Sequence, residues 1–318
     1  MSDSPFGPWP PPLPPRKEPP TPPLSVWLTG QRDLATQLCD SGYVPGTETD
    51  PHLMPPAVAA HAITTYTHPG ELVLDPNCGT GTVLVEALRA GRHTLGLTAQ
   101  QRWWKVARSN ITTTKTAGAW RDGSVLDARP KMLAGIRAAG LVGRVGLILT
   151  TLRTSLDDLT RSSDRDPDTE LETALADLAV TMSHCEPLLR SGGYVVVAAR
   201  PRRRSDGALV DLPTRLIDAA ASAGLVPIER CVALTAAVHG SRVITRASFA
   251  ERKVVVRTQG APVTLTAHHD VLAFQLPHDA ELAAAAAPRP CHIIAVRHQR
   301  TDRNNHSIAH SPVGRRAA

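Results

Sequence analysis

The stretch that most constrains the fold is Glu71–Leu97, ELVLDPNCGTGTVLVEALRAGRHTLGL. A short apolar strand at Val73–Asp75 runs into a glycine turn, and Val83–Ala90 follows with apolar residues at helical spacing. A second apolar strand is expected at His93–Leu97. Such a βαβ unit places its glycine turn at the carboxyl end of the first strand, where open α/β sheets bind ligands.

The same alternation continues along the rest of the chain. Helices are expected over residues 56–67, 82–90, 100–113, 131–139, 171–189 and 212–223, and strands over 71–75, 93–97, 120–125, 145–149, 193–199, 226–234 and 270–275. Strands that alternate with helices in this way predict an α/β fold with a doubly wound, mostly parallel sheet.

Composition divides the chain into three parts. Residues 1–24 are nearly half proline, which predicts an extended, disordered leader, and residues 25–288 form the expected folded domain. Residues 289–318 carry six arginines against one acid, Asp302, so most of the formal net charge of +6 lies in this tail. The tail either holds phosphate backbones through charge alone or is a solvated, disordered end.

Cysteine spacing and apolar runs exclude several classes of protein. The five cysteines are scattered, with no paired Cys or His spacing of the kind that binds a metal, so we expect reduced, buried thiols and no metal site. No apolar run approaches the ~20 residues that a membrane-spanning helix needs, and the polar, proline-rich start is unlike a signal peptide. These features predict a cytoplasmic protein without a membrane partner.

The string Asp75–Thr82, DPNCGTGT, resembles the first motif of S-adenosylmethionine-dependent methyltransferases that methylate amino groups of bases. Further segments, at residues 25–31, 192–197 and 270–274, resemble bacterial DNA methylases of the N4-cytosine/N6-adenine type. The resemblance implies a Rossmann-like class I methyltransferase fold with S-adenosylmethionine as cofactor. It also implies a nucleic-acid partner, with DNA favoured over RNA.

The resemblance assigns the glycine turn to the cofactor. Asp75 is expected to contact the methionine amino group, and glycines without a Cβ let the backbone approach the cofactor closely. The helix that starts near Thr82 points its positive end at the methionine carboxylate. The expected contact residues of the turn are Asp75, Asn77, Cys78, Gly79, Gly81 and Thr82. From the residues alone, a strand–turn–helix junction without a ligand is the alternative.

Two further positions are expected to hold the cofactor's adenosine. The acid that usually binds the ribose hydroxyls is replaced by Thr98, which offers a neutral hydrogen bond of about half the strength. Asp127 fits the acid that reads the adenine amino group, although it is equally suited to cap the following helix. Upstream, Asp50–Pro56 resembles the family's HPxxxxP segment, with Asp50 in the place of its histidine.

The catalytic loop of the family has the pattern (D/N/S)PP(Y/F) and follows the fourth strand. Here the corresponding residues are Thr151, Leu152, Arg153 and Thr154. Thr151 keeps a hydroxyl acceptor for the base amine, whereas the prolines are absent and Thr154 replaces the aromatic ring that stacks on the base. Either the loop has lost catalysis, or base capture has moved elsewhere. Arg202, Arg203 and Arg204 are candidates for contacting a phosphate backbone, or form a solvated loop.

The sequence therefore predicts a methyltransferase acting on an exocyclic base amine of DNA or RNA, with reduced activity. Two alternatives stay open at this point. One is a catalytically inactive protein that keeps the fold and binds nucleic acid or a protein partner. The other is a methyltransferase for a substrate that is not a nucleic acid, since function depends on the site and not on the fold.

Overall fold

A computed structural model describes residues 22–132, 140–153, 167–204, 208–247, 252–253 and 264–278. Most of the proline-rich segment and all of the basic tail lie outside these residues. Within them, one sheet has the strand order β1-β7-β10-β6-β5-β2-β3-β4. Its strands are β1 (Val26–Trp27), β2 (Leu72–Asp75), β3 (His93–Thr98), β4 (Gly123–Asp127), β5 (Val145–Thr151), β6 (Leu189–Ala199), β7 (Val226–Leu234) and β10 (His268–Gln275).

The sheet is parallel except at β10. That strand pairs antiparallel with both β6 and β7, and the other pairings are parallel. The order reverses between β2 and β5, so the carboxyl ends of these two strands flank the point at which ligands bind in doubly wound sheets. The predicted Rossmann-like, mostly parallel fold is thus confirmed.

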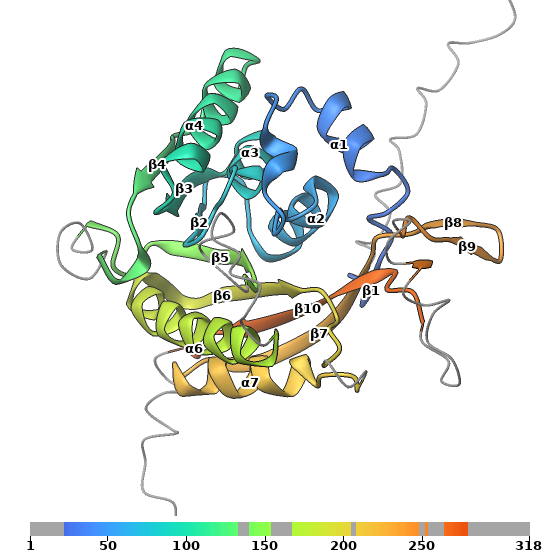
Figure 1. Ribbon diagram of the computed structural model, residues 1–318. Helices are drawn as coiled ribbons and strands as arrows, with labels where there is room; N and C mark the ends of the chain where they lie inside the picture. The colour runs from blue at the N-terminus through green and yellow to red at the C-terminus, as the bar shows by residue number, and fades with distance from the viewer. Residues whose placement is uncertain are drawn as a thin grey trace, which may run out of the picture.

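Helices cover both faces of the sheet (Figure 1). Helices α6 (Pro167–Cys185) and α7 (Leu212–Ser222) cover one face, and α2 (Pro56–Tyr66), α3 (Thr82–Arg89) and α4 (Gln101–Thr116) cover the other. Because neighbouring residues of a strand point to opposite faces, β6 sends Val195 and Val197 towards α6 and α7 and sends Val196 towards α2 and α3. Burial on both faces explains why these strands are continuously apolar.

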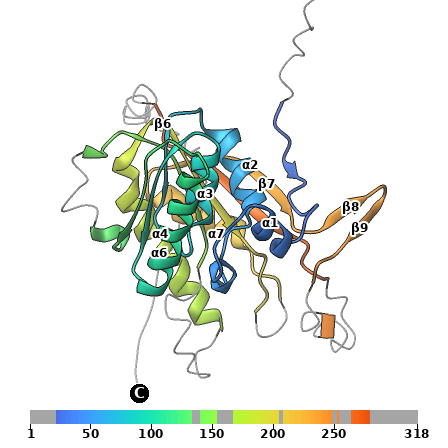
Figure 2. The same ribbon diagram turned by 90° about the horizontal axis from the view of Figure 1, so that it is seen from above.

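Smaller elements complete the described chain. They are α1 (Leu34–Asp40), the short 3-10 helices Thr47–Thr49, Pro130–Met132 and Glu186–Leu188, and the two-stranded hairpin of β8 (Ala237–His239) with β9 (Arg242–Ile244). The hairpin projects away from the sheet in both views (Figures 1 and 2). No helix among the described residues is long and apolar enough to cross a membrane.

Several expectations need correction. The helix expected over residues 171–189 ends at Cys185, because Pro187 sits in a short 3-10 turn and Leu189 already begins β6. Helix α1 went unpredicted because it is only seven residues long; Asp33 caps it by accepting a hydrogen bond from the Thr36 N–H. Cys39 is exposed, against the expectation of buried thiols. Residues 133–139 of the helix expected over 131–139 lie outside the described chain.

Candidate functional site

The glycine turn lies at the carboxyl end of β2, where the sequence placed it. The carboxylate of Asp75 is buried and accepts a hydrogen bond from the Asn77 N–H at 3.0 Å. Gly79 and Gly81 have φ angles of 51° and 87°, which side chains with a Cβ rarely adopt. The turn is anchored to β3 because the Cys78 N–H donates to the Leu97 carbonyl at 2.8 Å.

Burial changes the chemistry of the two titratable groups in this turn. It raises the pKa of Asp75 to about 7, against the hydrogen bond from Asn77 and the nearby charge of Arg153, both of which lower it. Burial also raises the pKa of the Cys78 thiol well above its usual range, so Cys78 is a neutral packing residue. Asp75 is thus a carboxyl group whose charge changes near neutral pH.

Residues 43–55 form a strap that is pinned across the turn. Thr82 donates its hydroxyl to the Met54 carbonyl at 2.9 Å, and Thr80 donates to the Thr47 carbonyl at 3.1 Å. From α4, the Asn110 amide donates to the Thr80 carbonyl at 2.9 Å. The Thr82 side chain, predicted as a cofactor contact, therefore holds the strap in place.

An ion pair between the strap and the loop after β5 covers the turn. Arg153 donates to both oxygens of Asp50, at 2.9 and 2.7 Å, and the two side chains are only 5% and 1% exposed. The Nε of Arg153 donates to the Asn77 carbonyl at 3.0 Å. Burial alone would lower the pKa of Arg153, but the charge and hydrogen bonds of Asp50, together with the nearby Asp75 and Cys78, outweigh it and raise that pKa. The raised pKa keeps the Arg153 guanidinium charged beside the Asp50 carboxylate.

The positions expected to hold adenosine lie at the ends of the neighbouring strands. Thr98 is buried at the end of β3, and its hydroxyl accepts a hydrogen bond from the Gln100 N–H at 3.3 Å. Asp127 is exposed at the end of β4 and accepts from the side chain of Gln101 at 3.3 Å. The register pairs Thr98 with Asp127, so the two predicted residues are neighbours.

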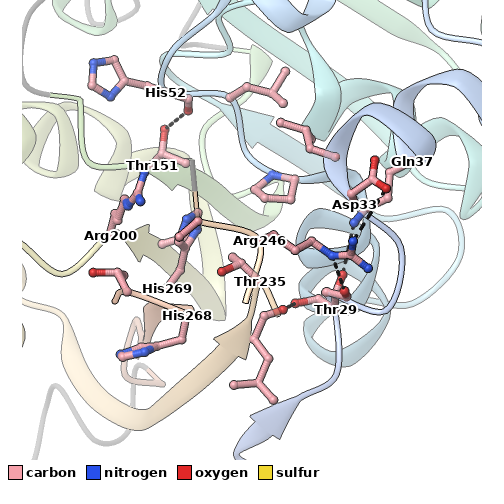
Figure 3. Close-up of a pocket in the computed structure, with 18 of the residues that line it drawn as sticks. Thr29, Asp33, Gln37, His52, Thr151, Arg200, Thr235, Arg246, His268 and His269 are labelled. Carbon is pink, nitrogen blue, oxygen red and sulfur yellow. Dashed lines mark hydrogen bonds and ion pairs between the residues drawn. The ribbon is translucent and has the colours of Figure 1, made fainter. Parts of the chain in front are cut away.

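A pocket of about 590 Å³ opens beside the loop after β5 (Figure 3). Thr151 and Leu152 line it together with Pro51 and His52 of the strap, and the Thr151 hydroxyl donates to the His52 carbonyl at 3.0 Å. The residues of its wall that carry charge or can gain it are Arg32, Asp33, His52, Arg200, Arg202, Arg246, His268 and His269. Asp33 is the single acid among the lining residues, so the wall is strongly cationic.

The basic wall is held by defined contacts. Arg246 donates to the carbonyls of Gly30 and Gln31, at 3.1 and 2.8 Å, and lies 3.7 Å from the Asp33 carboxylate. Burial, with the charge of Arg200 adding to it, lowers the pKa of His269 to about 4, so this imidazole is neutral at pH 7. Burial also lowers the pKa of Arg202.

The predicted nucleic-acid and catalytic residues are only partly brought together. Arg202 lines the pocket, whereas Arg203 and Arg204 are exposed beyond it. Thr151 lines the pocket, and Thr154 lies outside the described residues. Among the residues that the structure describes, no group of three or more His, Cys, Asp or Glu side chains is placed to hold a metal ion.

The segment that carries the glycine turn is similar to a known family. Residues 18–108, which contain the strap and the glycine turn, match the family model described as DNA methylase. These residues are similar to that family, and they make up less than a third of the chain. The match supports S-adenosylmethionine, the cofactor that the glycine turn predicts. A search of curated proteins finds no match.

A search of solved structures finds methyltransferases that are similar to this chain at low identity. TrmN from Thermus thermophilus is 16% identical with a TM-score of 0.45, and the match covers 74% of this chain and 52% of TrmN. Geranyl diphosphate methyltransferase, solved with GPP and sinefungin, is 13% identical with a TM-score of 0.40 over 69% of this chain and 77% of that enzyme. Precorrin-6y C5,15-methyltransferase from Geobacter metallireducens is 12% identical with a TM-score of 0.42, over 70% of this chain and 87% of that enzyme. At these values the likenesses say nothing about the substrate.

The residues of the turn fit the cofactor only in part. An added Cβ at Gly79 would overlap the Asp50 carboxylate and the Arg153 guanidinium, so the open face of this glycine is already occupied by the chain's own side chains. A group that approaches the Gly79 backbone from this side meets the side chains of Asp50 and Arg153. Of the two positions expected to hold adenosine, Asp127 is exposed and Thr98 is buried.

Sequence reasoning missed the Asp50–Arg153 pair and the part of the basic wall contributed by Arg32 and Arg246. A signal for the pair was present. Asp50 stands where the family has a histidine, and Arg153 stands where its catalytic loop has a proline. Two departures of opposite charge at positions flanking one turn point to a contact between them. No comparable signal placed Arg246 near the site.

Proposed function

We propose that the protein transfers the methyl group of S-adenosylmethionine to an exocyclic amine of a nucleic-acid base, in DNA in preference to RNA. The observation that supports this most is the cationic pocket beside Thr151. Four arginines against one acid favour a polyanionic partner, and phosphate backbones bind to proteins through such charge. The pocket volume is in the ~300–1,000 Å³ range of sites that enclose a small ligand or a flipped base.

Two oxygens at the pocket suit an amine. The exocyclic amine of a base carries two hydrogens, and its delocalised lone pair must be steered towards the methyl donor. The hydroxyl oxygen of Thr151 and the carbonyl of His52 are hydrogen-bond acceptors at the end of β5 and on the strap. Positioning of this kind contributes most of the rate when no covalent chemistry is required of the protein.

The test is a labelled-methyl assay on mixed DNA and RNA, followed by digestion to nucleosides and mass spectrometry. We expect label in N6-methyladenine or N4-methylcytosine, removable by nuclease and absent with Asp75→Ala. Label that survives nuclease and is released by protease would contradict the assignment. Cofactor binding is measured on the same preparation. A protein that binds no cofactor is thereby distinguished from one that binds the cofactor and does not methylate a base.

A second candidate function has a specific observation behind it. The Asp50 and Arg153 side chains occupy the space beside Gly79, which favours a protein that keeps the fold and binds nucleic acid without transferring a methyl group. This candidate predicts salt-dependent binding to DNA or RNA that S-adenosylmethionine leaves unchanged. Transfer above the level of the Asp75→Ala control excludes it.

A further inference from the structure

We propose that the Asp50–Arg153 ion pair is an internal occupant of the subsite for the cofactor's amino-acid group and competes with the cofactor for it. The inference rests on the proposed function, because it assigns the glycine turn to S-adenosylmethionine. It goes further by making two residues outside the family pattern responsible for how tightly the cofactor binds.

The pair lies where a ligand has to lie. Gly79 has a left-handed backbone, and the side of its Cα that lacks a Cβ faces the carboxylate of Asp50 and the guanidinium of Arg153. A glycine at such a position lets a ligand touch the backbone. Here the chain's own two side chains take that position, and both are almost completely buried.

The pair also has the charges of the ligand that it excludes. The Asp50 carboxylate accepts hydrogen bonds from two backbone N–H groups, that of His52 at 3.0 Å and that of Thr80 in the turn at 3.3 Å. The amino-acid end of the cofactor likewise presents a carboxylate that suits N–H donors of the turn. The Asp50 carboxylate therefore accepts a hydrogen bond from the turn that the carboxylate of the cofactor's amino-acid group would otherwise accept.

Arg153, the cation of the pair, lies beside groups that would also bind a positively charged ligand. The Arg153 guanidinium donates to the Asn77 carbonyl at 3.0 Å and lies close enough to Asp75 to lower the pKa of that acid. Its Cζ is 5.2 Å from the centre of the Trp103 ring, within the range of a cation–π contact. These are partners that an ammonium or sulfonium group would also use.

Competition has a measurable consequence. A ligand whose site is open only a fraction of the time binds with an affinity reduced by that fraction. Removing one member of a buried pair leaves the other charge uncompensated, so both members must be changed together. Removing both side chains from the space beside Gly79 should then raise the affinity for S-adenosylmethionine.

The experiment is calorimetric titration of wild type and the double variant Asp50→Ala/Arg153→Ala with two ligands. S-adenosylmethionine carries the amino-acid group, whereas 5′-methylthioadenosine keeps the adenosine and lacks that group. We expect S-adenosylmethionine to bind the double variant at least tenfold more tightly than wild type, with the affinity for 5′-methylthioadenosine changed less than twofold. The matched control is Glu172→Ala/Arg215→Ala, which removes a more exposed ion pair between α6 and α7 and should leave both affinities unchanged.

The outcomes separate this proposal from the proposed function. Equal or weaker binding of S-adenosylmethionine by the double variant overturns the competition and leaves the cofactor assignment standing. A similar gain for both ligands overturns the placement at the amino-acid group. Absence of binding by both proteins at millimolar concentration overturns the competition and the cofactor assignment together. If Asp50→Ala/Arg153→Ala does not fold, Asp50→Asn/Arg153→Gln keeps the size of the pair and is expected to give a smaller gain in the same direction.

Discussion

Thr151 and His52 come from segments far apart in the sequence and meet at the pocket, where the threonine hydroxyl donates a 3.0 Å hydrogen bond to the histidine carbonyl. The contact joins the loop after β5 to the strap over the glycine turn. It orients the hydroxyl so that its lone pairs remain available. Thr151, which we propose as an acceptor for the base amine, is therefore positioned by the strap.

This contact predicts how Thr151 variants behave. Thr151→Val keeps the shape and removes the hydroxyl, so we expect methyl transfer to fall about tenfold or more through loss of positioning. Thr151→Ser keeps the hydroxyl and should retain most of the rate. The measurement is the initial rate of methyl transfer at saturating cofactor, with the Kd for S-adenosylmethionine as the readout that should stay constant. A valine variant with the wild-type rate would contradict a role for this hydroxyl.

Asp75 predicts a pH dependence of stability. Its pKa is raised from 3.8 in the unfolded chain to about 7 in the folded protein. The folded state therefore holds this proton more tightly, and the associated stability is present in full below pH ~4 and is lost as the pH rises through ~7. Each unit of pKa difference corresponds to about 1.4 kcal/mol, so the total is a few kcal/mol.

Asp75→Asn removes this titration. We expect the Tm of the variant minus that of wild type, measured without cofactor, to increase as the pH is raised from 4.5 to 7.5. Parallel Tm profiles for the two proteins would show that the pKa of Asp75 is not raised. In wild type, the cofactor's ammonium group should also bind more tightly above pH 7, where Asp75 is charged.

Asn110 is expected to be a major source of stability for the turn. It is buried on α4, its amide donates to Thr80 and Thr47, and its oxygen accepts from the Val44 N–H. Asn110→Ala removes the hydrogen-bond partner of these groups. Each buried group left unsatisfied costs about 1–3 kcal/mol of stability. We expect a loss of roughly 2–4 kcal/mol in the free energy of unfolding, measured by urea denaturation. Thr112→Ala on the exposed side of α4 is the matched control and should change it by less than ~0.5 kcal/mol.

The pocket predicts unequal roles for neighbouring arginines in nucleic-acid binding. Arg202 lines the pocket, and Arg203 is exposed outside it. Arg202→Ala should weaken binding and reduce the slope of log K against log salt by about one, as for one lost phosphate contact. Arg203→Ala should leave the slope within error of wild type. Equal effects of the two variants would place the nucleic acid outside the pocket.

The fold could be predicted because its signals are local. The glycines of the turn stand where the backbone has positive φ angles, and a short stretch of sequence shows them. Helices such as the one expected over 82–90 are likewise visible from the helical spacing of their apolar residues. The end of α6 was placed four residues too late because apolar residues continue from the helix through Leu188 into β6, and periodicity does not mark that boundary. The hairpin of β8 and β9 was missed because its strands have only three residues each, although the two-residue turn Gly240–Ser241, with Gly240 at φ 57°, is a hairpin signal.

The site divides in the same way. Asp75, Gly79 and Gly81 follow one another in the chain, so a motif in the sequence determined their place at the end of β2. The pairing of Asp50 with Arg153 joins residues 103 positions apart and depends on the strap lying across the turn beside the loop after β5. The sequence by itself determined the doubly wound fold and the place of the glycine turn, because both follow from local patterns. Only the tertiary structure decided that this turn is filled by an ion pair and faced by a cationic pocket, because burial and charge pairing arise when distant segments pack together.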